Sequence, residues 1–185
     1  MIGRFINDAK RQVEDAFNWD MMSTTLTLTT VAGTTNYVAT GAGMHPRDLT
    51  LNDTTNKSVI KIAPLQWIID QQQLSTVSPG NPSYYAWNGS NGTDRKIELF
   101  PTPVGAATLK ANLYVPQAPL SSDNDILLIP SEAVEAGAYA RALVERGEDS
   151  GLNSSEAFAL YKGILADQIA YESALYIENS TWTPT

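Results

Sequence analysis

The first eighteen residues repeat apolar and charged positions with the period of an α-helix. Over residues 2–18 an apolar side chain recurs every three or four positions, and charged side chains lie between them. This pattern predicts an amphipathic helix with one face directed at a core. The predicted apolar face consists of Ile2, Phe5, Ile6, Ala9, Val13, Ala16 and Phe17.

After Ser23 the hydrophobic pattern changes to a period of two. Leu26 and Leu28 alternate with threonine, which is typical of a half-buried strand. Ala32-Gly33 then supplies a turn before the next short apolar run, which begins at Tyr37. We therefore expect two strands joined as a hairpin.

Further strands and one short helix are expected in the middle of the chain. Residues 48–53 and 58–63 flank a turn rich in Asn, Thr and Asp, which predicts a second hairpin. Proline at a first helical turn loses no hydrogen bond, so Pro64 favours a short helix over 64–74. The other predicted strands, bounded by prolines or Asn-Gly turns, are 84–87, 96–100 and 108–115.

The last third of the chain returns to the helical period. Pro130-Ser131 followed by Glu132 is a good helix start, and Gly151 separates this helix from a second one. The predicted core stripes are Ala136, Tyr139, Ala140, Leu143, Val144 and Gly147 in the first helix, and Ile164, Leu165, Ile169 and Leu175 in the second. The alanines that would allow close helix approach are Ala157, Ala159, Ala166, Ala170 and Ala174.

These elements predict an α+β fold. The N-terminal helix and the two C-terminal helices have apolar faces that should pack together, so residues 1–19 and 131–177 are expected to form a helical bundle. Residues 20–130 would be an inserted, antiparallel, β-rich domain that carries the short helix 64–74. Residues 178–185 would be an extended C-terminal tail.

Composition narrows the classes of function. The chain has 185 residues, of which 43% are hydrophobic and 17% charged, so it should fold with a polar but weakly charged surface. The net charge of −8 argues against binding to the phosphate backbone of nucleic acids. It is compatible with a channel through which DNA slides without being bound. No apolar run reaches the length of a membrane span or of a secretory signal, so we expect no membrane contact.

No motif predicts catalysis, a metal or a cofactor. The chain has no cysteine and a single histidine, His45, which lies in a glycine-containing loop without partner ligands or a nucleophile elbow. Asp123-Asn124-Asp125 is the nearest approach to a calcium loop, but it lacks the later ligands, so a linker is expected there. We therefore expect a protein that is not an enzyme.

The aromatic residues of one predicted strand leave a second hypothesis open. Tyr84, Tyr85 and Trp87 could form a platform that stacks on sugars, as in a glycan-binding β module of a phage tail or surface protein. Alternation places Tyr85 and Trp87 on one face and Tyr84 on the other, which favours core packing for at least one set.

The order of segments from Asn81 to Gly147 resembles the head-to-tail adaptor, or connector, proteins of tailed bacteriophages. The segments are Asn-Pro-Ser-Tyr-Tyr-Ala-Trp-Asn-Gly, Lys-Ile-Glu-Leu-Phe-Pro-Thr-Pro, Leu-Lys-Ala-Asn-Leu-Tyr-Val-Pro and Ile-Leu-Leu-Ile-Pro, followed by a helix. The N-terminal helix ending in Phe17-Asn18-Trp19 and the Thr-rich hairpin after it agree with the same family.

This resemblance implies a structural role in the virion. It implies a homo-oligomeric ring, commonly of twelve copies, at the portal–tail junction. The ring would be assembled from protein made in the host cytoplasm. Its partners would be the portal protein and the tail nozzle or other tail proteins. During genome ejection DNA would pass through its channel without sequence-specific binding.

Three groups of contact residues are expected within this picture. The C-terminal arm would dock on the portal through Tyr176, Ile177, Trp182 and Pro184. Exposed turns would meet tail components or neighbouring subunits through His45, Pro46, Asn88 and Asn91. The acidic residues expected to line the channel are Glu156, Asp167 and Glu172.

Overall fold

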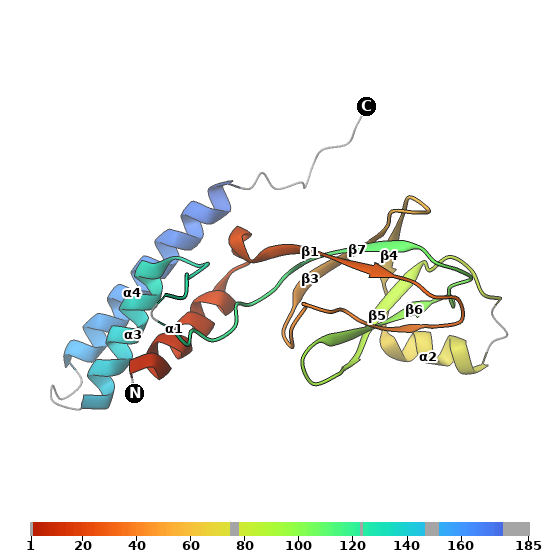
Figure 1. Cartoon of the computed structure of the whole chain (residues 1–185). Coiled ribbons are helices and arrows are strands. Elements are labelled where there is room, and N and C mark those ends of the chain that lie inside the picture. Colours follow the sequence, from red (N-terminus) through yellow and green to blue (C-terminus); the bar gives the residue numbers. More distant parts are fainter. Residues whose placement is uncertain (1, 75–77, 123, 147–151, 176–185) are drawn as a thin grey trace. The chain divides into compact units, whose positions relative to one another are not determined.

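The chain folds into helices and a curled sheet, as the computed structural model in Figure 1 shows. The described residues are 2–74, 78–122, 124–146 and 152–175. The predicted α+β class is confirmed. Contacts divide the chain into two compact units, a helical unit (residues 1–22 and 117–185) and a β unit (residues 23–116).

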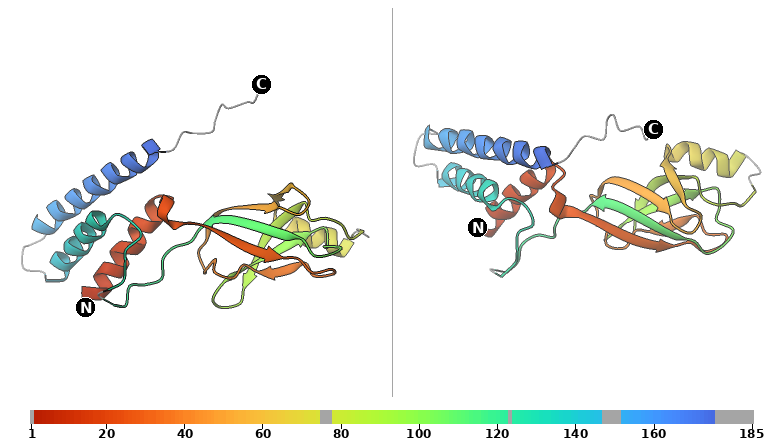
Figure 2. Two further views of the ribbon diagram at one scale, coloured as in Figure 1. Left: turned by 45° about the horizontal axis from the view of Figure 1, so that its top comes forward. Right: turned by 90° about the horizontal axis from the view of Figure 1, so that it is seen from above.

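The helical unit is organised around its middle helix. It contains α1 (Ile2–Ala16), α3 (Ser131–Arg146) and α4 (Leu152–Leu175), and α3 packs against both of the others. Both views in Figure 2 show α3 beside α1 and α4. Gly137 lies where the three helices meet: a Cβ there would be 3.2 Å from Ala9 Cβ and 3.1 Å from Tyr161 Cε2. Glycine thus permits a close helix crossing.

The predicted core stripes of the C-terminal helices are only partly right. In α3 the buried positions include Ala133, Val134 and Ala140, whereas Tyr139 and Val144 are exposed. In α4 most of the alanines and Leu175 are exposed. α4 carries apolar residues on nearly every side, so its sequence does not indicate which side is buried.

A buried ion pair on α1 holds the segment that returns from the β unit. The sequence pattern predicted that Lys10 and Glu14 face the solvent. The two residues are instead only 3% and 2% exposed, and Lys10 Nζ lies 2.8 Å from Glu14 Oε1. Lys10 Nζ donates to the Gln117 carbonyl oxygen at 2.6 Å, and the Gln117 N–H donates to Glu14 Oε1 at 3.0 Å. Each charge thus has both an ionic partner and a backbone partner, which offsets its desolvation.

One turn earlier on α1, the side-chain amide of Asn7 also forms hydrogen bonds with the backbone of this segment. Its Oδ1 accepts from the Leu120 N–H at 2.7 Å, and its Nδ2 donates to the Leu120 carbonyl oxygen at 3.0 Å. The Gln117 side chain fixes the following loop, donating to Ile126 O at 2.6 Å and accepting from Leu128 N at 3.3 Å. Gln117 and Leu120, assigned from the sequence to the β-rich domain, are therefore bound to α1.

Seven strands form one sheet in the β unit, in the order β1-β7-β3-β4-β5-β6-β2. Every second side chain of β7 is buried in the core of this unit. The core also includes Leu51, Ile60 and Tyr85 from other strands. The strands are β1 (Ser23–Thr29), β2 (Asn36–Val38), β3 (Arg47–Asp53), β4 (Ser58–Ile62), β5 (Tyr84–Ser90), β6 (Arg95–Phe100) and β7 (Thr108–Tyr114).

The strand positions agree with the sequence pattern, but one predicted pairing and the wholly antiparallel arrangement are wrong. β1 and β2 do not form a hairpin: β1 pairs with β7 from Ser23↔Tyr114 to Thr29↔Thr108, and β2 pairs with β6. The sheet is also not wholly antiparallel, because β4 and β5 are parallel and α2 (Leu65–Leu74) connects them. Alternation identifies a strand but says nothing of its partner. The predicted β3–β4 hairpin is confirmed.

The aromatic side chains of β5 do not form a common platform. Tyr85 is buried and its hydroxyl donates to Leu49 O at 2.6 Å; burial raises the pKa of this phenol. Trp87 packs against the same core. Tyr84 lies apart from them, with its ring edge-to-face against Trp67 of α2 at 5.2 Å between centroids. The stacking surface required by the glycan-binding hypothesis is therefore divided between two environments.

Candidate interaction surfaces

A carboxylate clamp joins two loops of the β unit into one tip. Asp94, 8% exposed, accepts through Oδ1 from the N–H groups of Gly41 at 3.1 Å and Gly43 at 2.9 Å. Both glycines have positive φ, 91° and 65°, which side-chain-bearing residues rarely adopt. Arg95 adds a hydrogen bond from Nε to Met44 O at 3.0 Å. Loop 41–46 is thus fixed to the turn between β5 and β6.

The clamp brings together two turns that the sequence analysis placed in one group of contact residues. Asn91 Oδ1 accepts from the N–H groups of Thr93 at 2.9 Å and Asp94 at 2.7 Å, which shapes the turn. Asn91 and His45 are exposed, while Pro46 is half-buried. We call residues 41–46 and 88–94 the loop tip. The Asn-Gly signals indicated a turn, but nothing in the sequence indicated that Asp94 would tie it to loop 41–46.

Asn88, the fourth residue of this predicted set, is engaged inside the β unit. Its Nδ2 donates to Glu98 Oε2 at 3.0 Å, and Asn36 and Gln72 donate to the same carboxylate at 2.8 and 3.0 Å. Burial by itself would raise the pKa of Glu98, but the hydrogen bonds from Thr35 and these three amides outweigh it and lower the pKa. The cluster therefore stabilises the ionised carboxylate and ties α2 to the sheet.

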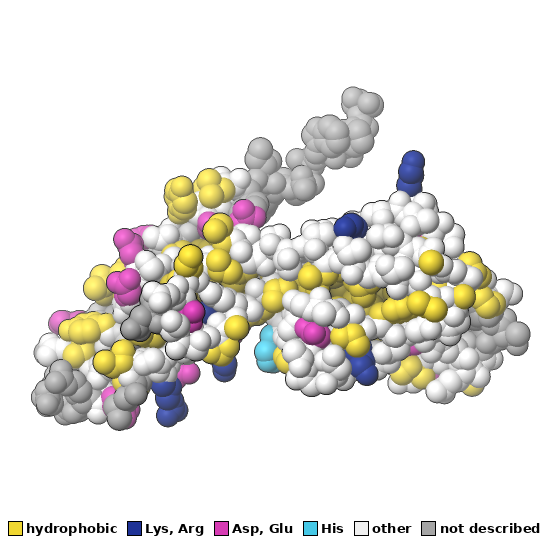
Figure 3. Space-filling model, in the orientation of Figure 1, with side chains coloured by type: hydrophobic (Ala, Val, Ile, Leu, Met, Phe, Trp, Pro, Cys, Tyr) yellow, Lys and Arg dark blue, Asp and Glu magenta, His cyan; other side chains and the backbone are white. Residues whose placement is uncertain are grey.

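The helical unit exposes a long apolar face along α4. Near its middle is Gly163, where an added Cβ would meet nothing within 4 Å, although glycine in a helix interior costs about 1 kcal/mol relative to alanine. Leu160 and Tyr171, on the same side of the helix, are 64% and 65% exposed. Figure 3 shows apolar groups over this unit, with acidic groups among them. The open face of α4 consists of Glu156, Ala159, Leu160, Gly163, Ala166, Asp167, Ala170, Tyr171 and Ala174.

α1 also exposes charged side chains, two of which, Arg4 and Asp8, line a groove shared with α3 and α4. Arg4 lies one turn before Asp8, with which it forms an ion pair at 3.7 Å, and Arg11 and Asp15 continue the same line. Successive positions along this line are three or four residues apart, so they share one side of the helix. This charged side of α1 consists of Arg4, Asp8, Arg11, Gln12 and Asp15.

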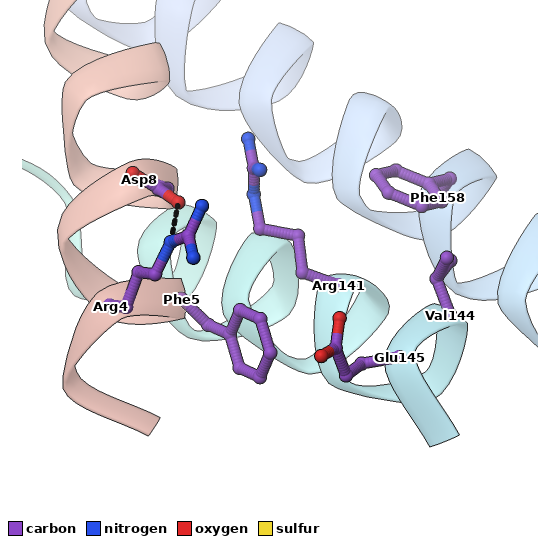
Figure 4. Close-up of a pocket in the computed structure, with 7 residues that line it drawn as sticks. All are labelled: Arg4, Phe5, Asp8, Arg141, Val144, Glu145 and Phe158. Carbon is purple, nitrogen blue, oxygen red and sulfur yellow. Dashed lines mark ion pairs between the residues drawn. The ribbon is translucent and has the colours of Figure 1, made fainter. Parts of the chain in front are cut away.

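A groove of about 400 Å³ opens among the three helices, with Phe5, Val144 and Phe158 among its walls. Figure 4 shows the charged residues around it, with the Arg4–Asp8 ion pair at one end and Arg141 between the helices. Burial raises the pKa of Tyr161, and the Arg141 charge opposes this shift. Two guanidinium groups and two carboxylates line the groove, so its charges indicate no particular class of ligand.

The predicted channel and portal residues fall in different settings. Glu156 and Asp167 are exposed on α4, whereas Glu172 is half-buried and accepts from the Asp20 N–H at 3.0 Å. The predicted portal-binding residues, Tyr176, Ile177, Trp182 and Pro184, lie outside the described residues. Within the described ranges no three His, Cys, Asp or Glu side chains gather as metal ligands. In those ranges no helix is long and apolar enough to cross a membrane.

Exposed apolar surface of the kind seen on α4 occurs where proteins contact other proteins, membranes or ligands. The family model described as SU10 adaptor protein matches residues 1–182, and the chain belongs to this family. It is an adaptor-type protein of a bacteriophage, and its relatives act with other structural proteins of the virion. No curated protein matches the chain.

Proposed function

We propose that this protein is a head-to-tail adaptor that forms a ring, links the portal to the tail and surrounds the path of the DNA. The observation that carries the proposal is the open face of α4. A 24-residue helix spans about 36 Å, and here it leaves leucine, tyrosine and alanine side chains in water. In a member of an adaptor family, such a face is best explained by burial against another subunit.

The charge of the chain supports the DNA path in this proposal. A net charge of −8 disfavours adhesion of phosphates to the ring wall, so a passing genome would not be retained. The loop tip is the second contact surface, directed at tail components or a neighbouring copy. Its backbone is held by Asp94 before any partner binds, so little ordering entropy would be lost on docking.

Light scattering during size-exclusion chromatography tests the assembly. For the chain alone at high concentration we expect a mass that is a multiple of 20.1 kDa. After addition of the portal protein from the same phage genome, we expect a complex whose mass exceeds that of the portal by such a multiple. A chain that remains at 20.1 kDa under both conditions would contradict the ring. Retention on a glycan array without any assembly would favour the glycan-binding alternative.

Docking through the C-terminal arm has its own test. A variant that ends at Ile177 should fold as the full chain does, by far-UV circular dichroism, but should no longer co-elute with the portal. The matched control replaces Trp182 alone with alanine, which should weaken co-elution less than the truncation does. If the truncated chain binds the portal as the full chain does, the arm is not the docking element.

A further inference from the structure

One edge of the sheet in the β unit is formed by β1, the first strand in the sheet order, which pairs only with β7. The Thr30 N–H donates to the Ala107 carbonyl oxygen at 2.9 Å. Because bonding alternates along an antiparallel pair, the even-numbered residues of β1 bond to β7. The backbone groups of the odd-numbered residues point toward the free edge, and these residues are Ser23, Thr25, Thr27 and Thr29.

Nothing in the described part of the chain occupies this edge. Among the described residues, no N–H or C=O group of those four residues has a hydrogen-bond partner. Their side chains are exposed, whereas Lys110 and Asn112, on the same outer face of β7, are half-buried. β7 lies between two strands, so the greater exposure along β1 is that of a strand with one side open.

β1 lacks the features by which natural edge strands resist pairing. Its seven residues include no charge and no proline, and its register with β7 is unbroken, whereas the β3–β7 and β5–β6 pairs both shift. β2, at the opposite edge, has only three residues. An edge such as β1 is a template for another strand. Its occupant must be extended, because only a strand presents backbone groups at the spacing found along β1.

The side chains beside the edge indicate which segment would fit. On the inner face Leu26 is half-buried at the margin of the core, so an added segment would cover it with an apolar side chain at every second residue. On the outer face Lys110 Nζ donates to Thr27 Oγ1 at 2.7 Å, which brings a positive charge to the edge. An acidic residue on the outer face of the segment would pair with this charge.

We propose that β1 receives an extended segment of another structural protein of the virion, which becomes the next strand of the sheet. The segment alternates apolar and polar residues and carries an acidic residue near Thr27. The adaptor family acts with other virion proteins, which supports a partner of this kind. A second copy fits less well, because two β1 strands paired about a two-fold axis would bring both Lys110 charges to one face and would close a dimer. The contact is separate from the subunit contact of the proposed ring.

Hydrogen exchange of the full chain, read at single residues by mass spectrometry with fragmentation, tests the inference. In the chain alone the N–H groups of Thr25, Thr27 and Thr29 should exchange quickly. Those of Leu26 and Leu28, which bond to β7, should exchange slowly. Each purified portal and tail protein encoded by the same phage genome is then added. With one of them we expect a complex in which exchange at the three threonines slows by about tenfold or more.

The outcomes distinguish this inference from the proposed function. Complexes in which the three threonines exchange as in the chain alone would overturn the inference, as would the absence of any complex. Slow exchange in the chain alone, with a dimer mass by light scattering, would overturn it in favour of a second copy. A ring that forms without protecting these amides leaves the proposed function standing. Protection by a partner without any ring leaves the inference standing.

Thr27→Pro and Thr27→Val form a matched pair of variants. Both remove the hydroxyl that Lys110 contacts, but only proline also removes the N–H at the free edge, where edge strands tolerate proline. Thr27→Pro should bind the protecting partner about tenfold more weakly than Thr27→Val, as expected for a lost backbone hydrogen bond. Slow exchange at Leu26 and Leu28 in both variants would show that β1 still pairs with β7. Equal binding by the two variants would overturn strand addition.

Discussion

The crossing of α1, α3 and α4 at Gly137 makes a quantitative prediction, because helix propensity and packing act in opposite directions there. Replacing glycine by alanine in a helix interior gains about 1 kcal/mol. At Gly137 the new methyl group would lie 3.2 Å from Ala9 Cβ and 3.1 Å from Tyr161 Cε2. Ala9 Cβ cannot move without its backbone, so overpacking should cost about 1–3 kcal/mol.

The matched control is Gly163→Ala on α4, where the added methyl group meets nothing within 4 Å. We expect Gly163→Ala to stabilise the isolated subunit by about 0.5–1 kcal/mol and Gly137→Ala to destabilise it by up to about 2 kcal/mol. Far-UV circular dichroism during urea unfolding suits the measurement, because the three long helices belong to the helical unit. A Gly137→Ala variant as stable as Gly163→Ala would refute the close crossing.

Three further variants test the polar interactions. Lys10→Met leaves the Glu14 carboxylate buried without its cation, so urea unfolding should show a loss of about 3–5 kcal/mol, whereas a loss below about 1 kcal/mol would mean that the pair is solvated. Asp94→Ala removes two hydrogen bonds to a carboxylate and should speed amide exchange at Gly41 and Gly43, and unchanged exchange there would contradict the clamp. The lowered pKa of Glu98 means that its contribution is complete above the ordinary value of 4.5 and is lost as the pH falls through the folded-state pKa. Glu98→Gln should therefore reduce the acid sensitivity of the β unit in thermal melts, and an identical pH profile would exclude this role.

Local elements were predictable because each has a strong pattern. The alternation in β7 marks both its position and its buried side. The period of α1 marks its position but not all of its buried side, because Lys10 and Glu14 are buried whereas Ile2 and Ala16 are exposed. The partner of β1 was not predictable, because the turn at Gly33 also fits a hairpin, whereas the strand pairs with β7, about eighty residues away. Pairings at such separation depend on how the whole sheet closes, which local sequence does not encode.

The candidate surfaces were predictable only in part. Exposed turns at His45 and Asn91 could be found from turn chemistry, but the Asp94 clamp depends on backbone N–H groups that no side-chain pattern reveals. Lys10 and Glu14 carry a detectable signal, a charge pair four residues apart, but such pairs are usually solvated. The open face of α4 was missed because its alanines and leucines suit a buried helix equally well.

Electron microscopy of the portal–tail junction of the phage that encodes this chain tests the central claim most directly. The account predicts a ring of identical copies between portal and tail around the DNA path, with the open face of α4 buried against a neighbouring subunit. Density for this chain at a tail fibre or elsewhere on the particle, with no ring at the junction, would contradict it.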